Sequence, residues 1–183
     1  SALVIREALG QPDGIAATLR RLGRAESRRG EGGRALGHLV AARALLRDAG
    51  LESRLARIEV ELAEVRWRRS EPDHARRHLG AASDLSGRAL ARHALLSALV
   101  APRDQVLALA RKAVAACERD RWRSGQLLAG ALAAFVEQDV ARLGAALADL
   151  ERVGHAEFAR LSRQWNEALE GAEETEEIDL GPR

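Results

Sequence analysis

Two histidines, His74 and His78, stand four positions apart in a segment with a helical pattern, so they share one helix face. Glu71 and Asp73 come just before and beside them, and imidazole and carboxylate groups together are typical zinc ligands. No third strong ligand follows at a fixed spacing. We therefore expect both histidines to be exposed polar residues beside Arg76, and we predict no metal site.

Other reactive side chains offer no catalytic pattern. Cys117 lies among alanines in a helical segment, which favours a buried, inert thiol. The run Gly30-Glu31-Gly32-Gly33 lacks the Lys-Ser/Thr of a phosphate loop and does not follow a strand. Gly-x-Ser-x-Gly, His-Glu-x-x-His and Cys-x-x-Cys do not occur. The sequence therefore predicts neither an enzyme nor a cofactor.

The composition indicates a helical core of small residues. Apolar residues make up 46% of the 183 and aromatic residues only 3%, so alanine, leucine and valine must fill the core. Lys112 is the only lysine, an arginine bias typical of GC-rich bacterial genomes. A single cysteine, no long apolar run and no signal-peptide pattern predict a bacterial cytoplasmic protein without a membrane partner. A start without Met indicates a fragment of a longer protein.

Proline and glycine divide the chain into helical segments. No segment alternates apolar and polar residues over the length of a strand, so the sequence predicts an all-α fold. Gly50 stands where a helix C-cap belongs, and Ser70, Pro72 and Asp73 form a helix-start pattern. After a short helix within 1–11, the expected helices lie near 13–29, 33–49, 52–69, 72–84, 86–101, 103–119, 121–136, 139–153 and 155–170.

One short pattern recurs four times along these helices. A small residue precedes an Ala-x-x-x-apolar-x-x-Ala run by twelve positions. Recurrence at a few tens of residues is typical of a solenoid, in which each unit buries its apolar face by stacking on its neighbours. The four copies are Gly23 with Ala35, Leu39 and Ala42; Ala63 with Ala75, Leu79 and Ala82; Ala94 with Val106, Ala110 and Ala113; and Ala129 with Ala141, Ala145 and Ala148.

These residues, with Leu19 and Leu22 in the first copy and Leu62 in the second, resemble the tetratricopeptide repeat (TPR). The divergent spacing is similar to that of bacterial repeats attached to signalling proteins and large LuxR-type regulators. The resemblance implies a right-handed superhelix of antiparallel helical hairpins, with about four repeats in 12–170 and a capping helix at 155–170. Residues 1–11 would be the remnant of a preceding unit, and 171–183 an acidic mobile tail or linker.

The resemblance also implies a concave groove, lined by the first helix of each hairpin, that binds a peptide or a partner domain. An arginine-lined groove suits acidic groups, because guanidinium pairs with carboxylates. The alternative is a solvated, arginine-rich helix face. The groove candidates are Arg20, Arg24, Arg28, Arg57, Glu64, Trp67, Arg68, Arg88, Arg92 and Arg123, with Ser27, Val60, Ala91, Leu95 and Gln126 beside them.

Two details of this groove stay open. Arg20, Arg88 and Arg92 match basic positions of the carboxylate clamp found in some TPR domains, but Arg24 and Glu61 stand at its asparagine positions, so we do not expect a faithful clamp. Trp67 fits either an aromatic anchor in the groove or packing between hairpins. Trp122 and Trp165 are expected in the core or in the capping helix.

Charge is uneven along the chain. Residues 170–183 hold six acidic side chains against Arg183, a net charge of −5, which leaves +7 on the remaining body because the whole chain is +2. The acidic segment could visit the basic body or be a solvated linker. We expect an interaction or regulatory module with a protein or peptide partner. A spacer or oligomerisation arm, in which a second copy could be the partner, is the alternative, and a nucleic-acid-associated fragment is a third choice.

Overall fold

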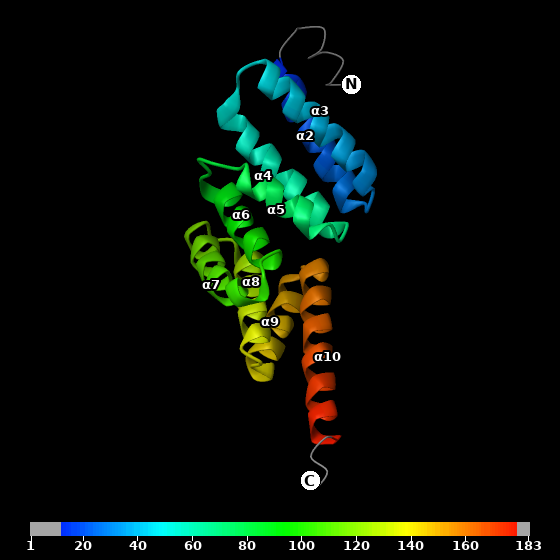
Figure 1. The fold of residues 1–183 in the computed structure, drawn as a ribbon, viewed down its shortest axis with the longest axis vertical. Helices are drawn as coiled ribbons and strands as arrows, with labels where there is room; N and C mark the ends of the chain where they lie inside the picture. The colour runs from blue at the N-terminus through cyan, green and yellow to red at the C-terminus, as the bar shows by residue number, and fades with distance from the viewer. Residues whose placement is uncertain (1–11, 179–183) are drawn as a thin grey trace. The chain divides into compact units, whose positions relative to one another are not determined.

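The computed structural model describes residues 12–178, with their side chains except those of residues 53 and 168–178. This part of the chain is all-α, as predicted, and holds no strand (Figure 1). The short helix predicted within 1–11 lies outside the described residues. The helices are α2 (Pro12–Arg28), α3 (Gly32–Asp48), α4 (Glu52–Arg68), α5 (Pro72–Gly80), α6 (Gly87–Leu99), α7 (Arg103–Arg119), α8 (Arg123–Val136), α9 (Val140–Val153) and α10 (Ala156–Ile178).

Most helix boundaries fall within two residues of the predicted ones. Two differ more. α5 ends at Gly80, before the predicted end at 84, and residues 81–86 form a longer connection to α6. α10 continues to Ile178, past the predicted end at 170, so the segment predicted as an acidic tail is helical as far as Ile178. Glutamate, which supplies four of residues 171–178, is a strong helix former.

Six of the helix connections use the same turn. The helix ends, one residue adopts a positive φ, and the backbone N–H of the next residue donates to the carbonyl five positions back, at 2.8–3.2 Å. This is the Schellman arrangement, which satisfies the last carbonyls of a helix. The positive-φ residues are Gly30, Gly50, Ser70, Arg121, Gln138 and Gly154, with φ between 53° and 82°.

These turns confirm one sequence prediction and correct another. Gly50 has a φ of 67° and ends α3 as a C-cap glycine, as predicted. Ser70 does not begin α5 as a capping residue. It occupies the positive-φ position after α4, with a φ of 59°, and Glu71 is the N-cap residue of α5. Pro72 is the first residue of that helix, where its missing N–H costs no hydrogen bond.

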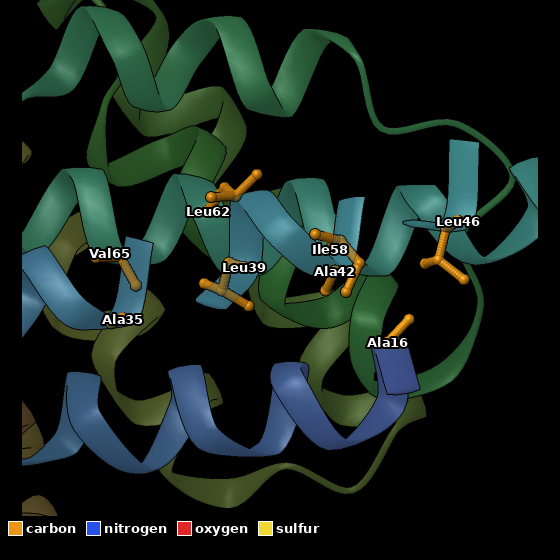
Figure 2. Close-up of a cluster of buried hydrophobic side chains, with 8 residues drawn as sticks. All are labelled: Ala16, Ala35, Leu39, Ala42, Leu46, Ile58, Leu62 and Val65. Atoms are coloured by element: carbon orange, nitrogen blue, oxygen red, sulfur yellow. The ribbon is translucent and has the colours of Figure 1, made fainter. Parts of the chain in front are cut away.

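The chain divides into two compact units, one up to Ala89 and one from Leu90. In the first unit α2 packs on α3, α3 on α4, α4 on α5, and α2 also contacts α4. Figure 2 shows the core where the first three of these helices meet. Leu39 of α3 and Ile58 and Leu62 of α4 are almost fully buried there. Burial of each such side chain stabilises the fold by about 1.5–3 kcal/mol.

Gly23 allows α2 and α3 to approach closely. A Cβ atom built at this position would lie 2.9 Å from Leu39 Cγ and 3.1 Å from the carbonyl oxygen of Ala35. Ala35 itself is fully buried on the facing side of α3. The first copy of the repeat pattern therefore marks the closest part of the α2–α3 hairpin, and Ala75 is likewise fully buried in α5.

In the second unit α7 packs on α8, α8 on α9, and α10 contacts both α8 and α9. Trp122, Phe158 and Trp165 contribute to this core, as predicted for the two tryptophans. The Trp122 ring lies 6.2 Å from that of Phe158 and covers Gly125, where a Cβ atom would come within 2.5 Å of the indole. Phe135 stacks on Trp165 at 5.7 Å. Gly125 therefore leaves space for an indole.

The predicted register of the fourth copy is wrong. Ala141, Ala145 and Ala148 are exposed, whereas Leu143 and Leu150 of α9 are fully buried. In α9 the buried positions begin at Leu143 and not at the predicted Ala141, a shift of two residues. Buried Ala131 lies twelve positions before Leu143, so the spacing of the pattern is kept. In α7 the third copy keeps Ala110 and Ala113 fully buried, whereas Val106 is half-buried. Leucine gains more than alanine from burial, so it decides which side of α9 faces the core.

Candidate functional site

The contact between α2 and α4 carries three polar pairs, which we call the α2–α4 ladder. Asp13 pairs with Arg54 at the beginning of the two helices. In the middle, Arg20 Nη1 donates to Glu61 Oε1 at 2.9 Å. Near the end, Arg68 Nη1 donates to the Ser27 hydroxyl at 3.1 Å. Each pair joins one residue of α2 to one residue of α4.

The three pairs repeat with a constant register. Each joins residues 41 positions apart, and successive pairs lie seven residues further along both helices. Seven residues are about two helical turns, or roughly 10 Å, so the pairs align on one face of each helix. Because the residue numbers rise together, α2 and α4 run parallel. The three pairs therefore form separate contacts along one interface between α2 and α4.

Glu61 is the most buried member of the ladder, with only 4% of its side chain exposed. Arg24 Nε also lies 3.7 Å from its Oε1, so two guanidinium groups of α2 face one carboxylate of α4. A buried carboxylate is costly unless it is paired. Glu61 therefore fixes the directions of Arg20 and Arg24, whose side chains are 29% and 40% exposed.

The structure brings several of the predicted groove residues together. Arg20 and Arg68 belong to the ladder, Arg24 lies beside it at Glu61, and Glu64 pairs with Arg68 Nη2 at 2.9 Å. Arg28 and Arg57 are exposed on the same two helices. The sequence reasoning missed Asp13 and Arg54, and it read Glu61 only as a departure from the clamp pattern. A search for charged residues at a constant offset of 41 would have found both ion pairs.

Other predicted groove residues behave differently. Val60, Ala91 and Leu95 are buried at 0–2% exposure, so they belong to the core and do not face a groove. Trp67 is half-buried, which fits both roles considered for it. Arg88, near the end of the first unit, is exposed, and in the second unit Arg92 is half-buried and Arg123 donates to Asp149 Oδ2 at 3.2 Å. As members of a ligand-binding groove these arginines stay a prediction.

A second polar cluster joins α3, α4 and α5. Glu59 Oε2 lies 2.7 Å from His78 Nδ1, and Arg43 Nη1 lies 3.6 Å from Glu59 Oε1. The prediction that both histidines are exposed is therefore correct for His74 and wrong for His78, whose side chain is 17% exposed. Its partner Glu59 comes from a neighbouring helix, which the spacing of residues within α5 could not show.

Three further predictions concern reactive groups and membranes. Among the described residues, no group of three or more His, Cys, Asp or Glu side chains is placed to hold a metal ion. Cys117 is fully buried, as predicted. Across the described part of the chain, no helix combines the length and apolar character that a bilayer crossing requires.

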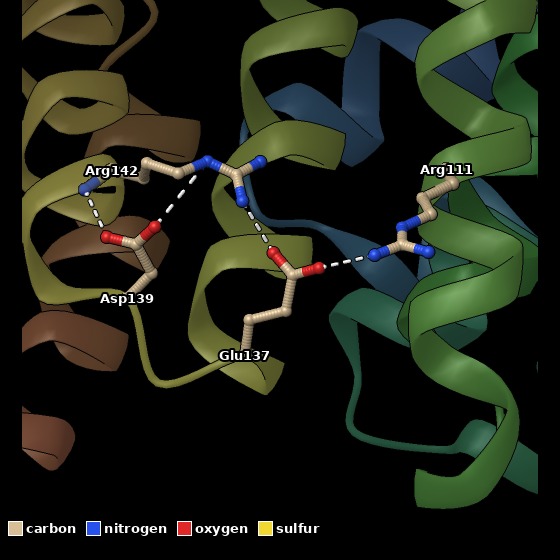
Figure 3. A network of polar contacts seen from close by, with 4 residues as sticks. All are labelled: Arg111, Glu137, Asp139 and Arg142. Atoms are coloured by element: carbon tan, nitrogen blue, oxygen red, sulfur yellow. Dashed lines mark hydrogen bonds and ion pairs between the residues drawn. The ribbon is translucent and has the colours of Figure 1, made fainter.

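Figure 3 shows the polar network at the end of α8 in the second unit. Glu137 accepts from Arg111 of α7 and from Arg142 of α9, each at 2.6 Å, and thereby links three consecutive helices. The hydrogen bond from Arg111, followed by that from Arg142, holds the pKa of Glu137 below its usual value. Hydrogen bonds from Arg66 and Arg69 likewise lower the pKa of Glu71 in the first unit.

No protein-family model, no curated protein and no solved structure matches the chain. The features that point to a function are therefore the ladder, its exposed arginines and the packing of the helices.

Proposed function

We propose that this chain is a TPR-like solenoid of helical hairpins. The packing within each unit supports the proposal. In the first unit α2, α3 and α4 contact one another pairwise, and in the second unit α8, α9 and α10 do the same. In both cases the third helix follows a Schellman turn with a glycine, Gly50 or Gly154, at the positive-φ position. A helical hairpin that packs on the first helix of the next hairpin is the contact expected between neighbouring repeats of a helical solenoid.

The capping role proposed for α10 is supported by its two faces. Phe158, Ala159 and Ser162 are buried against the rest of the second unit, whereas Arg160, Arg163 and Gln164 are exposed. A terminal helix with one apolar and one polar face closes a stack of repeats and keeps it soluble. The described part of α10 therefore fits the end of a solenoid.

We propose that the module binds a peptide or partner protein that carries carboxylates, and that the contact surface is the face along the α2–α4 ladder. The observation that carries this proposal is the local excess of arginine. Six arginines lie in or beside the ladder, against four carboxylates. They are Arg20, Arg24, Arg28, Arg54, Arg57 and Arg68, and the carboxylates are those of Asp13, Glu61, Glu64 and Glu26, the last of which lies 3.5 Å from His38 Nε2 of α3. Oriented guanidinium groups with exposed N–H donors are suited to carboxylate recognition.

A charge-reversal experiment tests this function. The probe is a fluorescent peptide of alternating glutamate and serine, blocked at both ends. We expect Arg28→Glu with Arg57→Glu to weaken binding at least tenfold, because both side chains are exposed next to the ladder. The matched control is Arg21→Glu with Arg47→Glu, two exposed arginines of α2 and α3. If the two double variants weaken peptide binding equally, the loss reflects the net charge of the protein and not a site along the ladder.

The ladder also favours a second candidate function. Arg20, Arg24 and Arg68 are bonded to side chains of their own molecule, as expected for a structural contact between hairpins. A spacer or oligomerisation arm would use the same contacts without any ligand. Binding of the glutamate peptide with no loss in the Arg28/Arg57 variant, or no binding at all, would favour this second function.

A further inference from the structure

The contact between Glu59 and His78 decides which nitrogen of the imidazole ring can bind a ligand. Glu59 Oε2 lies 2.7 Å from His78 Nδ1, and only 9% of the Glu59 side chain is exposed. The other carboxylate oxygen, Oε1, lies 3.6 Å from Arg43 Nη1. A carboxylate accepts hydrogen bonds, so Nδ1 carries the proton and Nε2 of the neutral ring holds the lone pair.

The lone pair of His78 Nε2 is accessible from solvent. Among the described residues, the ring makes no polar contact besides the one from Nδ1 to Glu59. Nε2 is also not one of the buried nitrogen and oxygen atoms that lack a partner in this part of the chain. Because Nε2 is neither bonded to a described residue nor buried, it faces water.

His74 precedes His78 by one helical turn on the same side of α5. Residues four apart on a helix are neighbours, with about 5–6 Å between their Cβ atoms. His74 is exposed and makes no polar contact with the described residues, so its ring can turn towards His78. Two histidines at this spacing are a known way to hold one metal ion on a helix face.

We propose that His74 and His78 bind one divalent transition-metal ion of the class that prefers imidazole, which includes Cu²⁺, Ni²⁺ and Zn²⁺. Glu59 orients the His78 ring, as carboxylates commonly do for metal-binding histidines. Water fills the remaining coordination positions, since no group of three ligands occurs among the described residues. The sequence predicted no metal site because it lacked a third ligand, and it could not show the carboxylate on α4.

The neighbouring charges set the expected order of affinity. Arg76 is two residues from each histidine, therefore on the opposite face of α5, and it pairs with Asp73. Exposed Arg77 follows His74 by three positions, and its charge opposes a bound cation. We therefore expect Cu²⁺, which forms the most stable complexes of the series, to bind best, and Arg77→Gln to bind it more tightly.

Calorimetric titration of Cu²⁺ into the full chain at neutral pH tests the site. We expect His74→Gln and His78→Gln each to bind at least tenfold more weakly than wild type. The double variant should be no weaker than either single one, because loss of one imidazole already ends chelation. The matched control is His38→Gln. His38 also faces a glutamate of the preceding helix, Glu26 at 3.5 Å, but has no histidine four positions away, so this variant should bind as wild type does.

Two further measurements make the result specific. Electron paramagnetic resonance of the Cu²⁺ complex should show two coordinated imidazole nitrogens in wild type and one in His74→Gln. Glu59→Gln should weaken binding about tenfold, and circular dichroism checks that each variant is folded. Wild-type affinity in His74→Gln, or an equal loss in His38→Gln, would overturn the site. Wild-type affinity in a folded Glu59→Gln variant would overturn the orienting role of Glu59.

Discussion

Arg20 and Glu61 are 41 positions apart in the sequence, yet Arg20 Nη1 lies 2.9 Å from Glu61 Oε1. This contact joins α2 to α4 across the intervening helix α3. Glu61 is only 4% exposed, so the free energy of folding depends on its pairing. The pair ties the first helix of one hairpin to the first helix of the next.

A double-mutant cycle on this pair should reveal its contribution. We expect Arg20→Gln and Glu61→Gln to show a coupling of about 1–2 kcal/mol in urea unfolding, because the carboxylate is buried and the guanidinium is partly exposed. The exposed pair Arg34–Glu31 within one helix turn is the control, with about 0–0.5 kcal/mol. A coupling no larger than in this control would show that the ladder is not a structural contact.

Two glycines in the first hairpin should respond oppositely to alanine. Gly23→Ala should destabilise the fold by about 1–3 kcal/mol, because its Cβ atom would lie 2.9 Å from Leu39 Cγ. Gly37→Ala should stabilise it by about 0.5–1 kcal/mol, because Gly37 lies inside α3 with open space around the added atom. Chemical denaturation measures both changes. Equal effects in the two variants would contradict the close α2–α3 contact.

The positive-φ turns predict stabilising substitutions. Ser70, Arg121 and Gln138 occupy the position that Gly30, Gly50 and Gly154 occupy in the other Schellman turns. Replacing each of the three by glycine should relieve about 0.5–1 kcal/mol of backbone strain, and Gly154→Ala should cost a similar amount. Thermal melts of the single variants test the signs. Glycine variants that are all less stable than wild type would refute the common turn geometry.

The Glu137 network predicts a dependence on pH. Because hydrogen bonds from Arg111 and Arg142 lower the pKa of Glu137 in the folded state, its contribution to stability is present above the unfolded value of 4.5. That contribution is lost as the pH falls below 4.5 through the lowered pKa. Arg111→Gln removes the largest cause and should raise the pKa of Glu137 towards 4.5. Carboxyl NMR titration measures this shift, and an unchanged pKa would contradict the contacts in Figure 3.

Much of the fold could be predicted from local sequence signals. Pro12, Pro72 and the glycines after α2 and α3 mark helix ends correctly, because proline and glycine act through the backbone of their own turn. The register of α9 could not be predicted from its alanines. Alanine is small enough for either face, and the side facing the core is decided by Leu143 and Leu150.

The candidate site was predicted only in part. Local pattern grouped Arg20, Arg24 and Arg68, which the structure places at the α2–α4 contact, and their role in a ligand-binding groove stays a prediction. It could not show that Glu61 and Ser27 are their partners, because these pairs depend on how far α4 slides along α2. The contacts Arg20–Glu61 and Arg68–Ser27 are therefore set by the packing of α4 against α2 and not by the local sequence. Their constant offset of 41 becomes visible once two helices are assumed to run parallel.

The central claim is that an acidic partner binds along the α2–α4 ladder. Backbone amide NMR of the full chain, titrated with the glutamate–serine peptide at low salt, tests it most directly. We predict saturable shifts concentrated at residues 20–28 of α2 and 57–68 of α4, and none with the matched glutamine–serine peptide. Shifts spread evenly over the exposed arginines of α7, α9 and α10, or no shifts at all, would contradict the claim.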